Sequence, residues 1–154
     1  MITLANTNQA EIVRKILTEL SDWFGDLHAI ASYAEEAEKR PLLIAQSDNG
    51  DVSGFLCLKP QTDATSEVLV MGVRPAYHRQ GLGRALVACA IEQERAKGIS
   101  YLSVKTLAPA ASHAGYERTR AFYLSLGFKP VEVFSTLWGP DNPCLLMIRS
   151  TAKV

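Results

Sequence analysis

The feature that most constrains this sequence is an apolar strand that runs through a glycine turn directly into a helix. It extends from Val70 to Leu86 and reads VMGVRPAYHRQGLGRAL. The apolar residues up to Val73 are typical of a strand, and those after Gly81 follow a helical pattern. The first N–H groups of a helix have no partners within it, and the helix dipole adds partial positive charge there. Because Gly81 and Gly83 have no Cβ, a phosphate or pyrophosphate can approach this backbone closely.

Two familiar phosphate-binding motifs do not fit this turn. A nucleotide P-loop needs a Gly-Lys-Ser/Thr sequence, and none follows here. A dinucleotide fingerprint needs a third small residue, and Leu86 occupies that position. The remaining alternatives are a different kind of anion site or an ordinary helix that happens to start with glycine.

Length and composition narrow the class of protein. With 154 residues, 47% of them hydrophobic and 21% charged, the chain is expected to be one globular domain over 1–154. Sixteen Lys and Arg balance sixteen Asp and Glu, which argues against a nucleic-acid partner and against a polybasic membrane-surface protein. We expect no membrane segment, no secretory signal and a cytoplasmic location. Three separated cysteines and three scattered histidines predict neither a disulfide framework nor a metal site.

The hydrophobic pattern predicts strands and helices in an irregular order. Turn signals at 48–51 and 139–143 predict two hairpins. The expected strands cover Ile2–Ala5, Leu42–Gln46, Val52–Leu58, Val68–Val73, Tyr101–Leu107, Val131–Leu137 and Leu145–Arg149. The expected helices begin after capping side chains at Asn6–Asn8, follow Ser21-Asp22 as far as Lys39, and cover Gly81–Lys97 and Tyr116–Leu126. This order predicts a mixed α/β sheet rather than a doubly wound fold.

Two motifs together resemble the GNAT superfamily of acetyl-CoA-dependent N-acetyltransferases. The family's pyrophosphate motif is Arg/Gln-x-x-Gly-x-Gly/Ala, commonly after Val-x-Pro. Residues 73–75 here read Val-Arg-Pro and residues 78–83 read His-Arg-Gln-Gly-Leu-Gly, with His78 where Arg or Gln is usual. Downstream, Tyr123 followed by Gly127-Phe128 matches a second family motif, and Tyr116 stands where Asn is frequent.

The resemblance, which covers roughly Leu42 to Arg149, implies a fold and a cosubstrate. The implied fold is α/β (α+β): a mixed, mostly antiparallel central sheet flanked by about four helices. Its splayed strands, bearing Val73 and Val104, would hold acetyl-CoA, and no metal is implied. The implied cofactor-binding residues are Met71, Gly72, Val73, His78, Arg79, Gln80, Gly81, Leu82, Gly83, Arg84 and Tyr116.

The resemblance also gives Tyr123 the role of general acid. A phenol has a pKa of about 10 and a thiol about 8.5, so Tyr123 would be protonated at neutral pH and able to donate to the departing thiolate. A half-buried aromatic packing residue is the alternative. Glu67, at the start of the strand that carries Met71, is a candidate general base. A solvated strand-end Glu is its alternative, and backbone carbonyls with a water chain could accept the proton instead.

The acceptor is expected to be a small cationic amine. The resemblance makes the early helices flank the acceptor entrance, so Trp23, Phe24 and Tyr33 are candidates for contacting it, as is Trp138 beside a turn. The acidic residues of this region are Glu19, Asp22, Asp26, Glu35, Glu36 and Glu38, with no Lys or Arg among them. Such a region would attract a cation, although a solvated helix face is the alternative. A protein amine as acceptor, a non-catalytic acyl-CoA sensor and a homodimer are also compatible with the sequence.

Overall fold

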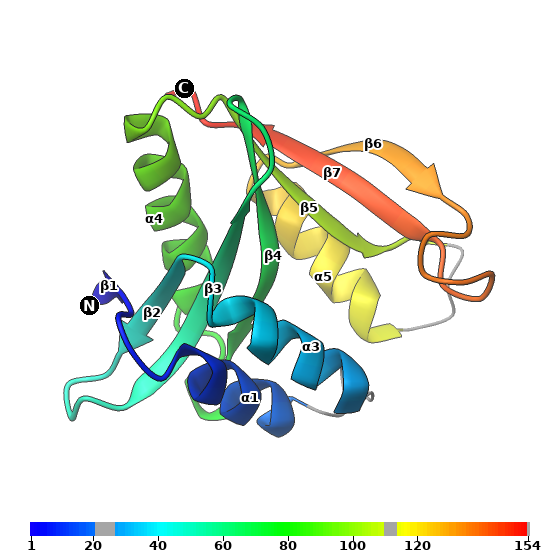
Figure 1. Cartoon of the computed structure of the whole chain (residues 1–154). Helices are drawn as coiled ribbons and strands as arrows, with labels where there is room; N and C mark the ends of the chain where they lie inside the picture. Colours follow the sequence, from blue (N-terminus) through cyan, green and yellow to red (C-terminus); the bar gives the residue numbers. More distant parts are fainter. Residues whose placement is uncertain (21–26, 110–113, 154) are drawn as a thin grey trace. The chain divides into compact units, whose positions relative to one another are not determined.

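A computed structural model of the chain describes residues 1–20, 27–109 and 114–153 (Figure 1). The chain forms two compact units. Unit 1 comprises Met1–Lys59 and Val68–Gln93, and unit 2 comprises Pro60–Glu67 and Glu94–Val154. Within the described ranges, no helix is long and apolar enough to cross a membrane.

Unit 1 contains strands in the order β1-β2-β3-β4. These strands are β1 (Ile2–Leu4), β2 (Leu42–Gln46), β3 (Val52–Pro60) and β4 (Thr65–Val73), of which β3 and β4 extend along the chain into unit 2. β2 pairs antiparallel with both β1 and β3, so the predicted first hairpin is confirmed. Its turn contains Gly50 at a φ of 88°, a left-handed conformation that favours glycine.

Two helices cover part of unit 1, α1 (Gln9–Glu19) and α3 (Leu27–Ala37). Val13, Ile16 and Leu17 recur at helical spacing on α1 and are fully buried, together with Phe55 of β3. The expected side-chain cap at the start of α1 is wrong. Asn8 has a φ of 56° and its side chain makes no capping hydrogen bond; its carbonyl accepts from the N–H of Ile12 instead.

Helix α4 (Leu82–Ala96) follows β4 and buries Leu86, Val87 and Ala90. It packs tightly in unit 1, because a Cβ on Gly54 would lie 3.1 Å from the Gly72 carbonyl oxygen and 3.3 Å from Leu86 Cδ1. The helix ends one residue before the predicted Lys97, and Gly98 stops it with a φ of 88°.

Unit 2 contains β5 (Tyr101–Leu107), β6 (Lys129–Phe134) and β7 (Cys144–Ser150) in the order β5-β7-β6, with both pairs antiparallel. The second predicted hairpin is thus confirmed, but β6 begins and ends earlier than the predicted Val131–Leu137. Its pairing with β7 is irregular between Pro130 and Glu132, because proline cannot donate a ladder hydrogen bond.

Helix α5 (Ala114–Ser125) is the helix of unit 2 that carries Tyr123. It ends as predicted: Gly127 has a φ of 88°, and the N–H of Phe128 donates to the carbonyl of Tyr123 at 3.1 Å. Phe128 is fully buried. Four α-helices and mostly antiparallel strands in the described residues confirm the predicted mixed α/β class.

Candidate functional site

The predicted anion-binding turn is built on the last residues of β4. The N–H of Arg74 donates to the Ser53 carbonyl at 2.9 Å, which keeps the strand end on β3. A short 3-10 helix, η1 (Pro75–Tyr77), then begins at a proline, whose missing N–H breaks no bond at this position. The sequence analysis missed η1, although Pro75 marks its start.

The turn itself exposes backbone at the start of α4. Arg79 and Gly81 have φ values of 65° and 78°, and the first bond of α4 runs from the N–H of Ala85 to the carbonyl of Gly81 at 3.0 Å. The N–H groups of the residues between them therefore have no partner within the helix. A Cβ on Gly81 would meet nothing within 4 Å, so the space beside this backbone is open. The arrangement can accept an anion.

The basic residues around the turn differ in how they are engaged. Arg74 forms a two-bond ion pair with Glu19, with Nε–Oε2 at 2.8 Å and Nη2–Oε1 at 3.2 Å. His78 Nε2 lies 2.6 Å from the carbonyl oxygen of Val73. Arg79 and Arg84 are both exposed. Among the described residues, no carboxylate pairs with Arg79, which leaves its charge available to a bound anion.

The candidates on β4 have different surroundings. Met71 and Val73 are half-buried on one face of the strand, whereas Gly72 is buried. A Cβ on Gly72 would lie 3.0 Å from Leu20 Cδ1 and 3.2 Å from Phe55 Cε1. Close packing of the core of unit 1 therefore explains the glycine at 72 without any ligand.

Two tyrosines lie on α5 in unit 2. Tyr123 is 5% exposed and packs edge-on against Phe122 and Phe128, with ring centroids 5.3 and 5.4 Å away. It is thus buried rather than half-buried. Tyr116 lies seven residues earlier, which is two helical turns along the same face. Burial raises the pKa of Tyr116 above its usual value, so its phenol stays protonated at neutral pH.

Glu67 is buried, which contradicts the alternative of a solvated strand-end residue. It is 4% exposed, and its Oε2 lies 2.6 Å from Lys105 Nζ, a residue of β5 that the sequence analysis did not single out. The two residues are 38 positions apart, so no local pattern could pair them. Cys144 lies in the same environment: burial raises the pKa of its thiol, Lys105 lowers it and Glu67 raises it.

The other cysteines are also shielded. Burial raises the pKa of Cys57 to about 12, and burial likewise raises the pKa of the half-buried Cys89. All three thiols are reduced and unbridged. Raised thiol pKa values remove thiolate at neutral pH, so these side chains are unsuited to be nucleophiles.

The acceptor candidates are only partly described by the structure. Trp23 and Phe24 lie outside the described residues. Tyr33 packs half-buried against the hydrophobic core of unit 1, and Trp138 is 38% exposed in the β6–β7 connection. The structure thus places Tyr33 as a packing residue and leaves Trp138 available at the surface.

Several carboxylates of the acidic region from Glu19 to Glu38 already have partners. Glu19 pairs with Arg74, and Glu36 pairs with Arg40 at 3.0 Å. Glu38 accepts a hydrogen bond from the backbone N–H of Ala10 at 2.8 Å. Asp22 and Asp26 lie outside the described residues. Glu35 of α3 is exposed and has no ion-pair partner in the part of the chain that the structure describes.

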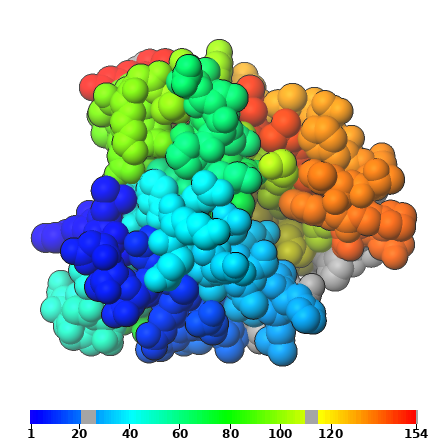
Figure 2. All heavy atoms as spheres, in the orientation of Figure 1, coloured from blue at the N-terminus to red at the C-terminus, as the bar shows by residue number. Residues whose placement is uncertain are grey.

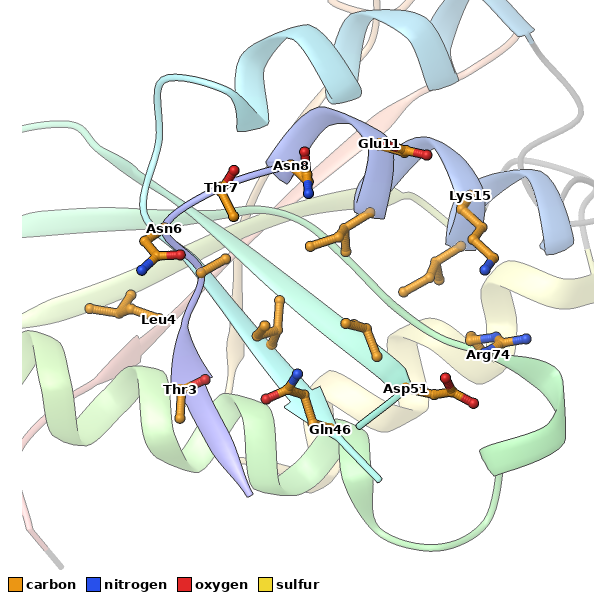
Figure 3. A pocket seen from close by; sticks show the side chains of 15 residues that line it. Thr3, Leu4, Asn6, Thr7, Asn8, Glu11, Lys15, Gln46, Asp51 and Arg74 are labelled. Atoms are coloured by element: carbon orange, nitrogen blue, oxygen red, sulfur yellow. The ribbon is translucent and has the colours of Figure 1, made fainter. Parts of the chain in front are cut away.

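A separate hollow of about 600 Å³ lies within unit 1, between α1, β1 and the β2–β3 hairpin (Figure 3). Figure 2 shows the N-terminal segment and the β2–β3 turn side by side at the surface. Ile12, Ile44 and Val52 are among its apolar lining residues, and charged side chains of both signs surround it. These charges are Glu11, Lys15, Asp51 and Arg74, whose opposite signs balance. The hollow therefore selects neither an anionic nor a cationic ligand.

A family model described as "Acetyltransferase (GNAT) domain" matches residues 38–130, which is more than half of the chain and includes the turn, Tyr116 and Tyr123. The chain belongs to this family. The family membership predicted from the two motifs is confirmed.

Individual relatives of this chain have different acceptors in their names. A mycothiol acetyltransferase from Beutenbergia cavernae is 34% identical over 91 residues, which are 59% of this chain and 29% of that protein. The chain thus spans less than a third of that relative. The solved structure of a GNAT-family protein from Desulfovibrio desulfuricans has a TM-score of 0.86 at 22% identity and covers 99% of both chains.

A further structure with the same fold is an aminoglycoside 6'-N-acetyltransferase complexed with coenzyme A. It has a TM-score of 0.78 at 20% identity and covers 100% of this chain and 98% of that one. At this identity the likeness shows that the GNAT fold is shared. In the described residues of this GNAT-family chain, no group of three or more His, Cys, Asp or Glu could hold a metal ion.

Proposed function

We propose that this protein transfers an acetyl group from acetyl-CoA to a primary amine of a small cationic molecule. The observation that carries the proposal is the open backbone at Gly81, where the start of α4 presents N–H groups beside empty space. A pyrophosphate fits such a site by charge and by size. The coenzyme A complex of the aminoglycoside acetyltransferase and the name of the mycothiol acetyltransferase support the same choice of cosubstrate and acceptor class.

Acetyl-CoA would be held chiefly by main-chain atoms. The N–H groups from Gly81 to Arg84 would bind the pyrophosphate, and Arg79 would add charge. The pantetheine arm would pair with backbone groups near Met71 and Val73, and Tyr116 would contact the cosubstrate from α5. The splayed pair of strands that this requires stays a prediction.

The chemistry needs one proton donor and one proton acceptor. The neutral amine nitrogen attacks the thioester carbon, the carbon–sulfur bond breaks, and the thiolate takes the hydroxyl proton of Tyr123. The proton that the nitrogen loses as the amide forms returns Tyr123 to its neutral phenol. A phenol with a pKa of about 10 keeps that proton until the thiolate forms. The aromatic neighbours Phe122 and Phe128 fix the ring of Tyr123, so its hydroxyl has few alternative positions.

Glu67 is the proposed general base. An alkylamine with a pKa of about 10.4 is only about 0.1% neutral near pH 7.4, and reaching the neutral form costs about 4 kcal/mol. The ion pair with Lys105 engages Oε2 of Glu67 and keeps the carboxylate in place, with Oε1 outside that pair. Glu67 would accept the ammonium proton directly or through water.

Release of coenzyme A tests this function. Purified protein is incubated with acetyl-CoA and a panel of cationic, neutral and acidic amines, free thiol is followed over time, and acetylated products are identified by mass spectrometry. We expect amine-dependent thiol release that is fastest with small cationic amines. Gly81→Glu should abolish it by placing a carboxylate where the pyrophosphate binds.

Gly81→Gln is the matched control, because it has the same size and the same unfavourable φ but no charge. It should retain substantially more acetyl-CoA binding than Gly81→Glu. Equal binding by both folded variants and the wild type would disprove the assignment of the turn.

The pairing of Glu67 with Lys105 favours one second candidate, an acyl-CoA sensor without turnover. Oε2 of Glu67 already accepts a hydrogen bond from Lys105 Nζ, so this oxygen is occupied when an amine arrives. Such a protein would bind acetyl-CoA at the turn but release no thiol with any amine, protein amines included.

A further inference from the structure

The side chain of His78 is turned back onto the end of β4. Its Nε2 lies 2.6 Å from the carbonyl oxygen of Val73. Because a carbonyl can only accept a hydrogen bond, Nε2 must carry the proton. The contact closes residues 73–78 into a loop around η1, whose own bonds run from the N–H of Tyr77 to Arg74 and from the N–H of His78 to Pro75.

The residue that follows this contact has an unfavourable backbone conformation. Arg79 has a φ of 65°, in the left-handed region that side chains with a Cβ disfavour. Such a conformation persists only where neighbouring structure holds it. Along the described chain, the next backbone hydrogen bond after that of His78 is the one from the N–H of Ala85 to the carbonyl of Gly81. The contact of His78 therefore lies directly before a stretch of backbone without such bonds.

We propose that His78 is a positioning residue for the anion-binding turn. Its bond to Val73 holds the backbone from Arg79 to Gly83 in the conformation that presents N–H groups to a phosphate. Because the turn is ordered before the ligand arrives, binding avoids the entropic cost of ordering it. The proposal rests on the proposed function, in which that ligand is acetyl-CoA. His78 thus acts on the ligand through the turn rather than by contacting a phosphate.

Two substitutions separate the hydrogen bond from the ring. The amide nitrogen of Gln reaches about as far from the backbone as Nε2 of histidine, whereas that of Asn is closer to the position of Nδ1. His78→Gln can therefore donate to Val73, and His78→Asn cannot. His78 is exposed, so neither substitution removes buried packing. His78→Ser is a second variant without the donor, and thermal melting checks the fold of all three.

Amide hydrogen exchange of the ligand-free protein tests the positioning role directly. In His78→Asn and His78→Ser, the hydrogen-bonded amides on either side of the turn, those of Tyr77 and Ala85, should exchange about threefold to tenfold faster, the range expected for one hydrogen bond, whereas His78→Gln should match the wild type. Unchanged exchange in both donor-free variants would overturn the proposal. This measurement needs no ligand, so its result stands even if the proposed function fails.

Binding and kinetics then connect the turn to acetyl-CoA. In His78→Asn, the Kd for coenzyme A and the KM for acetyl-CoA should rise by the same threefold to tenfold factor with kcat unchanged, and His78→Gln should restore both. A loss of kcat without a change in Kd would contradict the positioning role. Absence of coenzyme A binding by the wild-type protein would instead refute the proposed function.

Discussion

The Gly81 turn in unit 1 and the helix of unit 2 that carries Tyr123 differ in the groups they offer a ligand. The turn offers main-chain N–H groups, and the helix offers a side chain. At the turn, main-chain N–H groups without a partner in α4 lie beside the open space at Gly81. The candidate catalytic residues Tyr123 and Glu67 are instead buried side chains. Tyr123 packs against Phe128, and Glu67 pairs with Lys105. A main-chain N–H group is present whichever residue carries it, so binding by the turn does not require an Arg or Gln side chain at position 78 to contact the phosphate. A proton donor is a single side-chain atom, and the comparison predicts that it has no substitute.

The largest effect should follow from removing that atom. Tyr123→Phe deletes only the hydroxyl and keeps the ring between Phe122 and Phe128. We expect kcat to fall by about 10²–10⁴-fold with little change in the KM for acetyl-CoA, because general acid catalysis has this magnitude. Steady-state kinetics on the best amine measure both. Wild-type turnover in a folded Phe variant would remove Tyr123 from the mechanism.

A smaller effect, measured on stability, should follow from breaking the buried ion pair between Glu67 and Lys105. Lys105→Met leaves the carboxylate of Glu67 buried without its cation, and we expect the free energy of unfolding to fall by about 1–3 kcal/mol. Urea denaturation measures the change. Adding Glu67→Gln should recover part of the stability, because it removes the unpaired charge. Additive losses in the double variant would show that the two side chains do not interact.

Near the turn, each basic side chain should contribute less to acetyl-CoA binding than the main-chain N–H groups do. Arg79→Gln should raise the KM for acetyl-CoA roughly twofold to fivefold, as expected for one exposed charge. Arg74→Gln is the matched control, since its guanidinium is engaged by Glu19. It should leave the KM unchanged. A larger effect of Arg74 than of Arg79 would reverse the assignment of these two residues.

The smallest expected effect is on the electrostatic attraction of a cationic acceptor by the acidic side chains. kcat/KM for a cationic amine should fall as ionic strength rises, but by less than about tenfold, because Glu19, Glu36 and Glu38 already have partners. Glu35→Gln should reduce this salt dependence, whereas Glu36→Gln, which loses a side chain already paired with Arg40, should not. A flat salt profile, or faster turnover of acidic amines, would refute steering and leave the acetyltransferase activity untouched.

Local signals predicted much of the fold. The strands at Leu42–Gln46 and Tyr101–Leu107 have the predicted bounds, and Gly98 and Gly127 end α4 and α5 as expected. Each depends on a periodicity or a glycine within a few residues. β6 was placed too late, because its pairing is set by β7, which lies further along the chain.

The candidate site shows the same limit. The turn could be predicted because its strand, glycines and helix are consecutive in the sequence. Lys105 could not, because its role depends on Glu67, and a distant pairing leaves no mark on the periodicity of either strand. The bond from His78 to Val73 is local, yet neither residue type indicates it, because histidine makes many kinds of contact.

Burial raises the thiol pKa of Cys57, Cys89 and Cys144, so we expect the folded chain to react slowly with disulfide reagents. Such reagents consume thiolate, and burial leaves little of it at neutral pH. A colour produced in the presence of acetyl-CoA therefore reports the coenzyme's sulfur rather than the protein's. On unfolding, the same three side chains become reactive together. One disulfide reagent can therefore follow both the release of coenzyme A and the unfolding of the protein, and no label has to be added to the chain.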